Sequence, residues 1–225
     1  MAGAVIFDVD GTLVDSVDLH ARAWQEALQH FGHAVSFDAV RSQIGKGGDQ
    51  LMPVFVPAAE LQRRGKEIES FRSDLFKRRY LGEVTGFPGV PAMFERVRAA
   101  GLQAVLASSA KGDELQTYKR IAGIDDLVEA ETSSDDAEKS KPFPDIFQAA
   151  LDRAGVKAGE AAVVGDSPFD AEAAGRAGIT AIGVLCGGFP EAALREAGCR
   201  AVFRDPEDLL ARFDAFLRAA ELAPG

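Results

Sequence analysis

Short apolar runs recur along the chain, and each ends in a polar or glycine-rich turn. The runs are AVIFDVD, QAVLASSA, AAVVGDS, TAIGVL and RAVF. Apolar runs of this length without clean alternation predict strands that are buried on both faces, as in a parallel sheet. Helical patterns fill the intervals, including one with Val90, Phe94 and Val97 on a single face and Gly101 as its C-cap. This alternation predicts an α/β fold, a Rossmann-like parallel sheet with helices on both faces.

Residues 16–85 interrupt this alternation, because we find no convincing strand among them. Val17, Ala21, Trp24, Leu28 and Phe31 are spaced by four, three, four and three residues, which is the face of a helix. The segments SFDAVRSQIG and PAAELQRRGKEIESFRSDLFKRRYL predict further helices. We therefore expect a catalytic α/β core formed by 1–15 and 86–225, with an α-helical cap domain, 16–85, inserted into it.

Composition excludes several classes of protein. The chain has 225 residues, is 47% hydrophobic and carries a net charge of −10 without a basic stripe, so we expect no nucleic-acid partner. The sequence contains neither a signal-like start nor an apolar run of about 18 residues, so we expect a cytoplasmic protein without a membrane partner. Cys186 and Cys199 lack CxxC spacing, which favours free thiols over a disulfide. A monomer and a homodimer both remain open.

Chemically useful side chains follow three of the expected strands. They are Asp8, Asp10, Gly11 and Thr12 after the first strand, Ser108 and Ser109 after the second, and Asp166 and Asp170 after the third. Lys141 lies between the last two groups, in the turn-rich segment SKPFPD. Ligands of parallel α/β sheets bind at the carboxyl ends of the strands, so we expect these side chains to share one crevice.

Several acids in one crevice require a cation, and Mg²⁺ is the hard ion that carboxylate oxygens suit. We expect Asp8 and Asp166 to bind it directly, with Asp170 holding a metal-bound water or a neighbouring group. Lys141, Ser108 and the backbone amides near Gly11 and Thr12 would then hold an anion such as phosphate.

We expect Asp8 and Asp10 to have two different roles. An ionised Asp8, favoured by Mg²⁺ and Lys141, would be the nucleophile. Asp10 would transfer protons, and we expect negative neighbours and partial desolvation to raise its pKa toward that role.

These residues resemble the motifs of the haloacid dehalogenase superfamily, in the subfamily that carries a small helical cap. The matching segments are FDVDGTLVDS, Ser108, Lys141 in SKPFPDIF, and GDSPFDAEAAGRAG. The resemblance implies an aspartyl-phosphate on Asp8, and a general acid and then base at Asp10, whose backbone carbonyl also binds Mg²⁺. It implies that Asp166 completes the metal site with support from Asp170, and that Ser108 and Lys141 bind the phosphoryl group. Ser109 is a possible amide donor.

The same resemblance limits which activities we expect. Dehalogenases of the superfamily lack the second aspartate, so Asp10 argues against that reaction. The segments DLHARAW and SKPFPDIF look like the β-phosphoglucomutase branch, where a cap arginine grips a second phosphate; here QIGKGGDQL offers Lys46 and no arginine. We therefore expect a Mg²⁺-dependent phosphatase for small phosphorylated metabolites, of the phosphoglycolate or sugar phosphate type. A phosphosugar mutase and a non-catalytic regulatory protein are the alternatives. His20 is either a specificity residue of the cap, like Lys46, or a packed core histidine.

Overall fold

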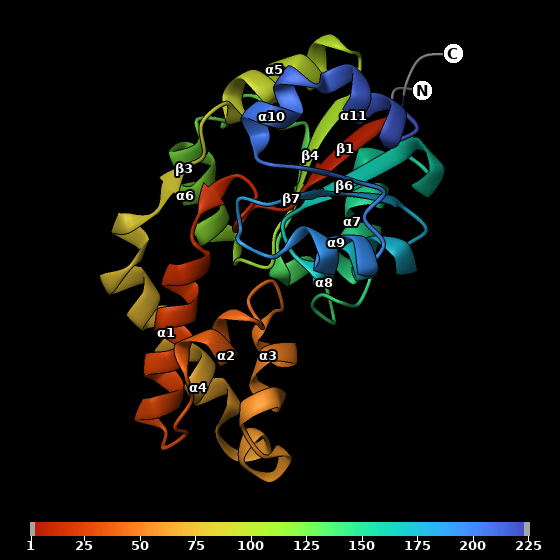
Figure 1. Ribbon diagram of the computed structural model, residues 1–225. Coiled ribbons are helices and arrows are strands. Elements are labelled where there is room, and N and C mark those ends of the chain that lie inside the picture. Colours follow the sequence, from red (N-terminus) through yellow and green to blue (C-terminus); the bar gives the residue numbers. More distant parts are fainter. Residues whose placement is uncertain (1–2, 223–225) are drawn as a thin grey trace.

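A parallel sheet forms the centre of the molecule, in a computed structural model that describes residues 3–222 (Figure 1). Its strands are β1 (Ala4–Phe7), β4 (Gln103–Ala107), β5 (Ala130–Thr132), β6 (Ala161–Gly165), β7 (Thr180–Val184) and β8 (Ala201–Phe203). Their order in the sheet is β5-β4-β1-β6-β7-β8. The parallel pairing confirms the α/β class, and the five apolar runs of the sequence all contribute strands.

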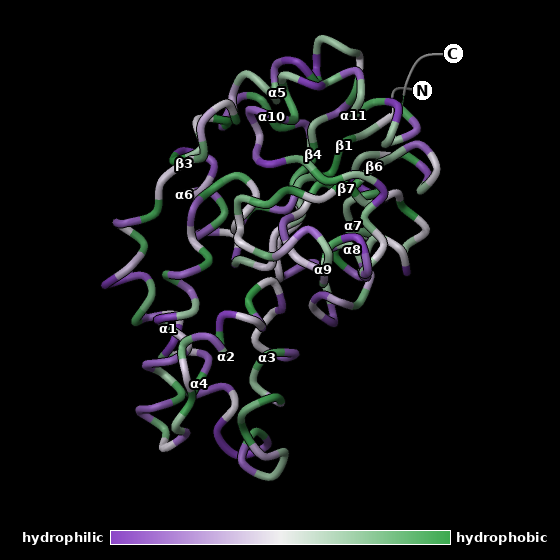
Figure 2. Tube along the Cα trace, in the orientation of Figure 1, coloured by the Kyte–Doolittle hydropathy of each residue, from purple (hydrophilic) through white to green (hydrophobic). Residues whose placement is uncertain are grey.

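Helices cover both faces of this sheet because alternate strand residues point to opposite sides. Val5 and Phe7 of β1 belong to one hydrophobic cluster, and Ala4 and Ile6 belong to the other. On the first face lie α5 (Val90–Ala99), α6 (Gly112–Ala122), α10 (Pro206–Ala211) and α11 (Phe213–Ala219); on the second lie α7 (Asp145–Ala154), α8 (Pro168–Arg176) and α9 (Glu191–Glu196). The central strands are accordingly the most continuous hydrophobic part of the chain (Figure 2).

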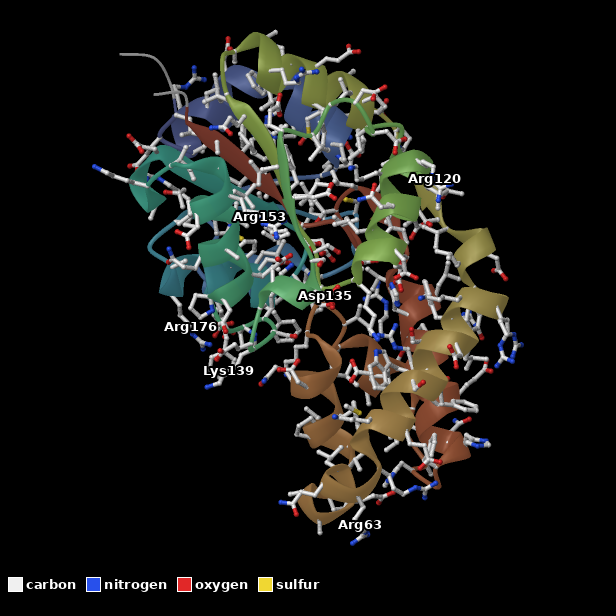
Figure 3. All side chains as sticks on the ribbon, turned by 180° about the vertical axis from the view of Figure 1, so that it is seen from behind. Arg63, Arg120, Asp135, Lys139, Arg153 and Arg176 are labelled. Atoms are coloured by element: carbon white, nitrogen blue, oxygen red, sulfur yellow. The ribbon has the colours of Figure 1, made fainter. Side chains whose placement is uncertain are left out.

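Four further helices form a separate group, which we call the helical unit. It consists of α1 (Val17–His30), α2 (Phe37–Arg41), α3 (Gly48–Phe55) and α4 (Ala58–Arg79). These helices bury their own hydrophobic cluster, which includes Trp24, Leu28, Leu51 and Ile68. The helical unit lies beyond the ends of the strands, and Arg63 lies at its far tip (Figures 1 and 3).

Two short antiparallel strands tie the helical unit to the core. β2 (Val14–Asp15) leads into α1, and β3 (Thr85–Gly86) follows α4 and the 3₁₀ turn η1 (Leu81–Glu83). The expectation that no strand lies within 16–85 is therefore wrong at Thr85. A two-residue ladder leaves no hydrophobic period in the sequence, and it forms because both chain passages meet at this hinge.

Some elements carried no sequence signal. Strand β5 is three residues long and includes the polar Glu131, and α3 begins within the glycine-rich segment that separates two predicted helices. The remaining short elements are the 3₁₀ turns η2 (Ser134–Asp136) and η3 (Ala158–Glu160). Gly101 follows α5 with φ +77°, as expected of a helix terminus.

Candidate active site

The carboxyl ends of three neighbouring strands meet at the edge that faces the helical unit. β1 pairs with β4 on one side and β6 on the other, and Phe7 lies opposite both Leu106 and Val164. Asp8, Ser108 and Asp166 directly follow these strands. The sheet order thus brings together the strand ends that the sequence singled out, as expected.

Three buried carboxylates gather at this edge. Asp8, Asp166 and Asp170 each present an oxygen within 4.8 Å of the others. The ammonium group of Lys141, itself buried, forms ion pairs with Asp8 and with Asp170, the latter at 2.7 Å. Three acids that share one ammonium group lack positive charge, so this donor set fits a bound cation.

The crowding of these acids changes their protonation. Burial raises the pKa of Asp8 to about 7. The positive charge of Lys141 acts to lower this pKa, and the negative charges of Asp170 and Asp10 act to raise it. Burial and the charges of Asp170 and Asp8 raise the pKa of Asp166 well above its ordinary value. A cation that binds here would favour the ionised form of both groups.

Asp170 serves two structural purposes at once. Its Oδ2 accepts hydrogen bonds from the Ser167 amide (3.1 Å) and the Ser167 hydroxyl (2.6 Å), which form a capping box at the start of α8. Its Oδ1 faces Lys141. The helix terminus therefore fixes the carboxylate in the orientation that the ion pair uses.

The turn after Asp8 packs tightly against the acids. Gly11 has φ +81°, and a Cβ at this position would lie 2.4 Å from Oδ2 of Asp166, so glycine is required on both counts. The Thr12 hydroxyl donates to Oδ2 of Asp8 at 3.2 Å. The Gly11 and Thr12 amides donate to the carbonyls of Val14 and Val9, which closes the turn. Phosphate binding by the amides near Gly11 and Thr12 stays a prediction.

The two serines after β4 have different positions. Ser108 is fully buried, and its Oγ accepts a hydrogen bond from the Ala110 amide at 3.0 Å. Ser109 lines the cavity beside Asp8 and Asp10. The structure thus places Ser109, rather than the Ser108 hydroxyl, at the cavity wall.

Asp10 points into the same cavity from the opposite side of the turn. Its Oδ1 accepts hydrogen bonds from Ser16 Oγ (2.6 Å) and lies 3.0 Å from His20 Nε2. Burial acts to raise the pKa of Asp10, but the charge and hydrogen bond of His20 and the hydrogen bond of Ser16 outweigh it and lower the pKa. The expected rise is therefore wrong, because the nearest ionisable partner of Asp10 is a histidine of α1 rather than another acid.

His20 is held by groups from both parts of the molecule. Its Nε2 lies 3.0 Å from the Tyr118 hydroxyl, which donates to Glu114 Oε1 at 2.8 Å. Its ring stacks on Phe76, with centroids 3.9 Å apart. The structure thus shows His20 packed between helices and in contact with Asp10, while its role in specificity stays a prediction. Tyr118 and Glu114 were missed, since the only signal in the sequence is two polar residues one turn apart on a buried face of α6.

A cavity of about 220 Å³ separates the core from the helical unit. Its wall includes Asp8, Asp10 and Ser109 from the core and His20, Lys46 and Arg72 from the helical unit. The Lys46 ammonium donates to Gln43 Oε1 at 2.6 Å and lies 4.6 Å from the centre of the Phe169 ring, and burial lowers its pKa. Lys46 therefore reaches the cavity at its rim, next to α8.

Polar contacts hold the helical unit against the core. Asp49 accepts from the Ser140 amide at 3.2 Å, next to Lys141. Arg41 donates to the Gly187 carbonyl at 2.9 Å and pairs with Asp18 at 2.6 Å. Asp135 of the core lies close to this junction (Figure 3). The cavity is therefore covered on the side that faces the helical unit.

Comparison with known proteins places this fold and site in context. The model of the haloacid dehalogenase-like hydrolases matches residues 5–184. The phosphoglycolate phosphatase of Yersinia pestis is 33% identical over 81% of this chain and 81% of its own. A phosphorylated carbohydrates phosphatase of Thermotoga maritima is 29% identical over 92% of this chain and 96% of its own. A hydrolase from Pseudomonas syringae has a TM-score of 0.85 at 29% identity, covering 94% of this chain and 98% of its own.

These similarities define the protein as an enzyme of the hydrolase class, built on an α/β core. The chain belongs to the haloacid dehalogenase-like hydrolase family. The same domain also occurs within a longer chain, since this sequence spans 19% of protein SUPPRESSOR OF QUENCHING 1, chloroplastic, of Arabidopsis thaliana, at 31% identity over 87% of this chain.

Two smaller expectations can be compared with the structure directly. Cys186 and Cys199 are both free thiols, as their spacing in the sequence predicts. Among residues 3–222, no helix is long and apolar enough to cross a membrane.

Proposed function

We propose that this protein is a Mg²⁺-dependent phosphatase that hydrolyses small phosphorylated metabolites through an aspartyl-phosphate on Asp8. One observation carries the proposal. Asp8 lies against Lys141 and Thr12 on one wall of the cavity, while Asp10, anchored by Ser16 and His20, faces the same space. Two carboxylates with different surroundings suit a nucleophile and a proton carrier.

Asp8, Asp166 and Asp170 would hold the ion, together with the backbone carbonyl of Asp10. When bound, Mg²⁺ supplies charge neutralisation for the phosphoryl oxygens and for the carboxylates. Lys141 would contact the phosphoryl group as well as Asp8. Ser109 lines the cavity and would contact the phosphoryl group, with Ser108 and Thr12 beside it after the same strand ends, and Gly11 keeps the turn tight.

The reaction then has two balanced steps. Asp8 attacks the phosphorus atom, and the bond to the ester oxygen breaks as Asp10 gives its proton to the departing alcohol. Asp10 next accepts a proton from water, which attacks the phosphorus atom and restores the Asp8 carboxylate with release of inorganic phosphate. The lowered pKa of Asp10 suits the base role, and a nearby phosphate dianion would raise it for the acid role.

The helical unit would act as the cap that limits substrate size. A cavity of about 220 Å³ is smaller than the about 300–1,000 Å³ typical for drug-sized ligands. Two relatives are named as phosphatases of phosphoglycolate and of phosphorylated carbohydrates. Phosphoglycolate and sugar phosphates are therefore the first substrates to assay.

A phosphate-release assay over such a panel tests this proposal. We expect activity with Mg²⁺, loss of activity with a chelator, and loss of activity in Asp8→Asn. Asp15→Asn is the matched control, because Asp15 is exposed, lies in β2 and does not line the cavity. Activity that survives both chelation and Asp8→Asn would rule out the mechanism. Phosphate migration within a sugar, with little release, would instead indicate a mutase.

A further inference from the structure

Arg72 of α4 lines the cavity between the core and the helical unit. Its guanidinium carbon lies 4.8 Å from the centre of the Trp24 ring, which forms the adjacent part of the wall. Its Nε is buried, and among residues 3–222 no group accepts a hydrogen bond from it. A buried cationic donor without an acceptor costs free energy that a ligand oxygen would recover.

Three other arginines of α4 behave differently. Arg64 pairs with Glu67 at 3.1 Å, Arg79 pairs with Glu26 at 2.8 Å, and Arg78 donates to the Asp74 carbonyl at 3.2 Å. Each of these is more exposed and has a local acceptor. Arg72 therefore differs from these three arginines because it lines the cavity.

Arg72 lines the same cavity as Asp10 and His20. Its positive charge reaches the Tyr118 hydroxyl, where it opposes the rise in pKa that burial and nearby acids cause. Tyr118 contacts His20, which contacts Asp10, the proposed proton donor to the ester oxygen. An anionic group on the departing alcohol, a few bonds from that oxygen, would thus come within reach of Arg72.

The charges around Arg72 favour a carboxylate over a second phosphate. Lys46, the next cation of the wall, is already engaged by Gln43 and Phe169. Glu69 and Asp49 line the same wall and would repel a dianion. One guanidinium carries a single positive charge, which balances one carboxylate but not the two negative charges of a second phosphate, and its parallel N–H donors can bind both carboxylate oxygens.

We propose that Arg72, supported by Trp24, binds a carboxylate on the leaving group, so that the substrates are phosphate esters of small hydroxy acids. This inference rests on the proposed phosphatase function. It excludes neutral sugar phosphates and sugar bisphosphates as the preferred substrates.

Matched substrates test the inference. 2-Phosphoglycolate carries the carboxylate, and 2-hydroxyethyl phosphate is its neutral counterpart. We expect wild-type kcat/KM to be at least about tenfold higher for the first, and Arg72→Met to lose about 10- to 100-fold on it, chiefly through KM. Activity on the neutral ester should change less than about threefold in the variant. Arg72→Lys should recover part of the loss. Arg78→Met, on the exposed side of the same helix, should leave kcat/KM unchanged for both substrates.

A binding measurement separates this inference from the proposed function. Trp24 is the single tryptophan of the chain, so its emission reports on ligands at Arg72. We expect 2-phosphoglycolate to alter this emission in Asp8→Asn, and the affinity to fall about 10-fold or more when Arg72→Met is added. Absence of phosphate release from every substrate would refute the phosphatase, while the Trp24 titration would still decide the role of Arg72.

Three results would overturn the inference: equal wild-type kcat/KM for the two esters, equal losses on both in Arg72→Met, or a loss in Arg72→Met confined to a sugar bisphosphate.

Discussion

The acid cluster of the core and the cavity wall of the helical unit face each other, but they are built differently. In the core, Asp8, Lys141 and Asp170 are buried and satisfy one another through ion pairs. In the helical unit, Arg72 packs against Trp24 while its Nε has no acceptor among residues 3–222, and Lys46 donates to the neutral amide of Gln43. The charged groups of the core are therefore paired with one another, whereas the wall of the helical unit includes one buried donor, Arg72 Nε, without an acceptor among residues 3–222. We interpret the first as the chemical apparatus and the second as the recognition surface.

The sharpest test of the core is the removal of the proton carrier. Asp10→Asn keeps the shape of the side chain and an oxygen that can accept from Ser16 and His20, but it removes the ionisable group. We expect kcat to fall by about 10²–10⁴-fold. Steady-state phosphate release at saturating substrate measures this, with Asp15→Asn as the control. An unchanged kcat would show that Asp10 does not carry the proton.

Replacing Lys141 tests how much its ion pairs with the buried acids stabilise the core. Lys141→Met leaves three buried carboxylates without their ammonium partner, so the metal-free protein should lose about 3–5 kcal/mol of unfolding free energy. Denaturant unfolding in chelator measures the loss, and added Mg²⁺ should restore part of it. Lys66→Met, at an exposed position of α4, is the control and should have almost no effect. A loss equal to that of the control would contradict the ion-pair description.

Tyr118 lies where the two regions meet. Tyr118→Phe removes the hydroxyl between His20 and Glu114 without changing the packing of α6, so His20 should hold Asp10 less firmly. We expect a loss in kcat of about 2- to 10-fold, with KM nearly unchanged and a displaced pH profile. Tyr80→Phe is a matched control, because Tyr80 bonds Glu26 away from the cavity. A change confined to KM would assign Tyr118 to substrate binding instead.

The smallest effect concerns pH and stability. Between the ordinary carboxyl pKa of about 4 and the raised pKa of Asp8 at about 7, the folded protein holds protons that the unfolded chain has released. Stability of the metal-free protein should therefore fall as pH rises through this window, by about 2–4 °C in Tm for each kcal/mol lost.

Saturating Mg²⁺ should remove this decline, since a bound cation favours the ionised acids. Metal-free Asp166→Asn should also decline less than wild type, because it has one carboxylate fewer in the cluster. Asp214→Asn, at an exposed position, should follow wild type. Thermal unfolding between pH 5 and 8 checks this, and identical slopes for wild type and Asp166→Asn would exclude a crowded acid cluster.

The sequence predicted the core better than the wall for a physical reason. Asp8, Ser108 and Asp166 directly follow buried strands, so their positions depend on local hydrophobic runs and on the parallel order of the sheet. Arg72 and Tyr118 depend on how α4 and α6 pack, which no local pattern in the sequence records. The error in the pKa of Asp10 has the same origin, because His20 reaches it from α1.

The aspartyl-phosphate on Asp8 is the central claim, and direct detection tests it. Asp10→Asn can be mixed with 2-phosphoglycolate and Mg²⁺, quenched in acid and digested for mass analysis. We predict one added phosphoryl group on the peptide that contains Asp8, and none in the double variant that also carries Asp8→Asn. A phosphoryl group on another residue, or turnover by Asp8→Asn without any phosphorylated peptide, would contradict it.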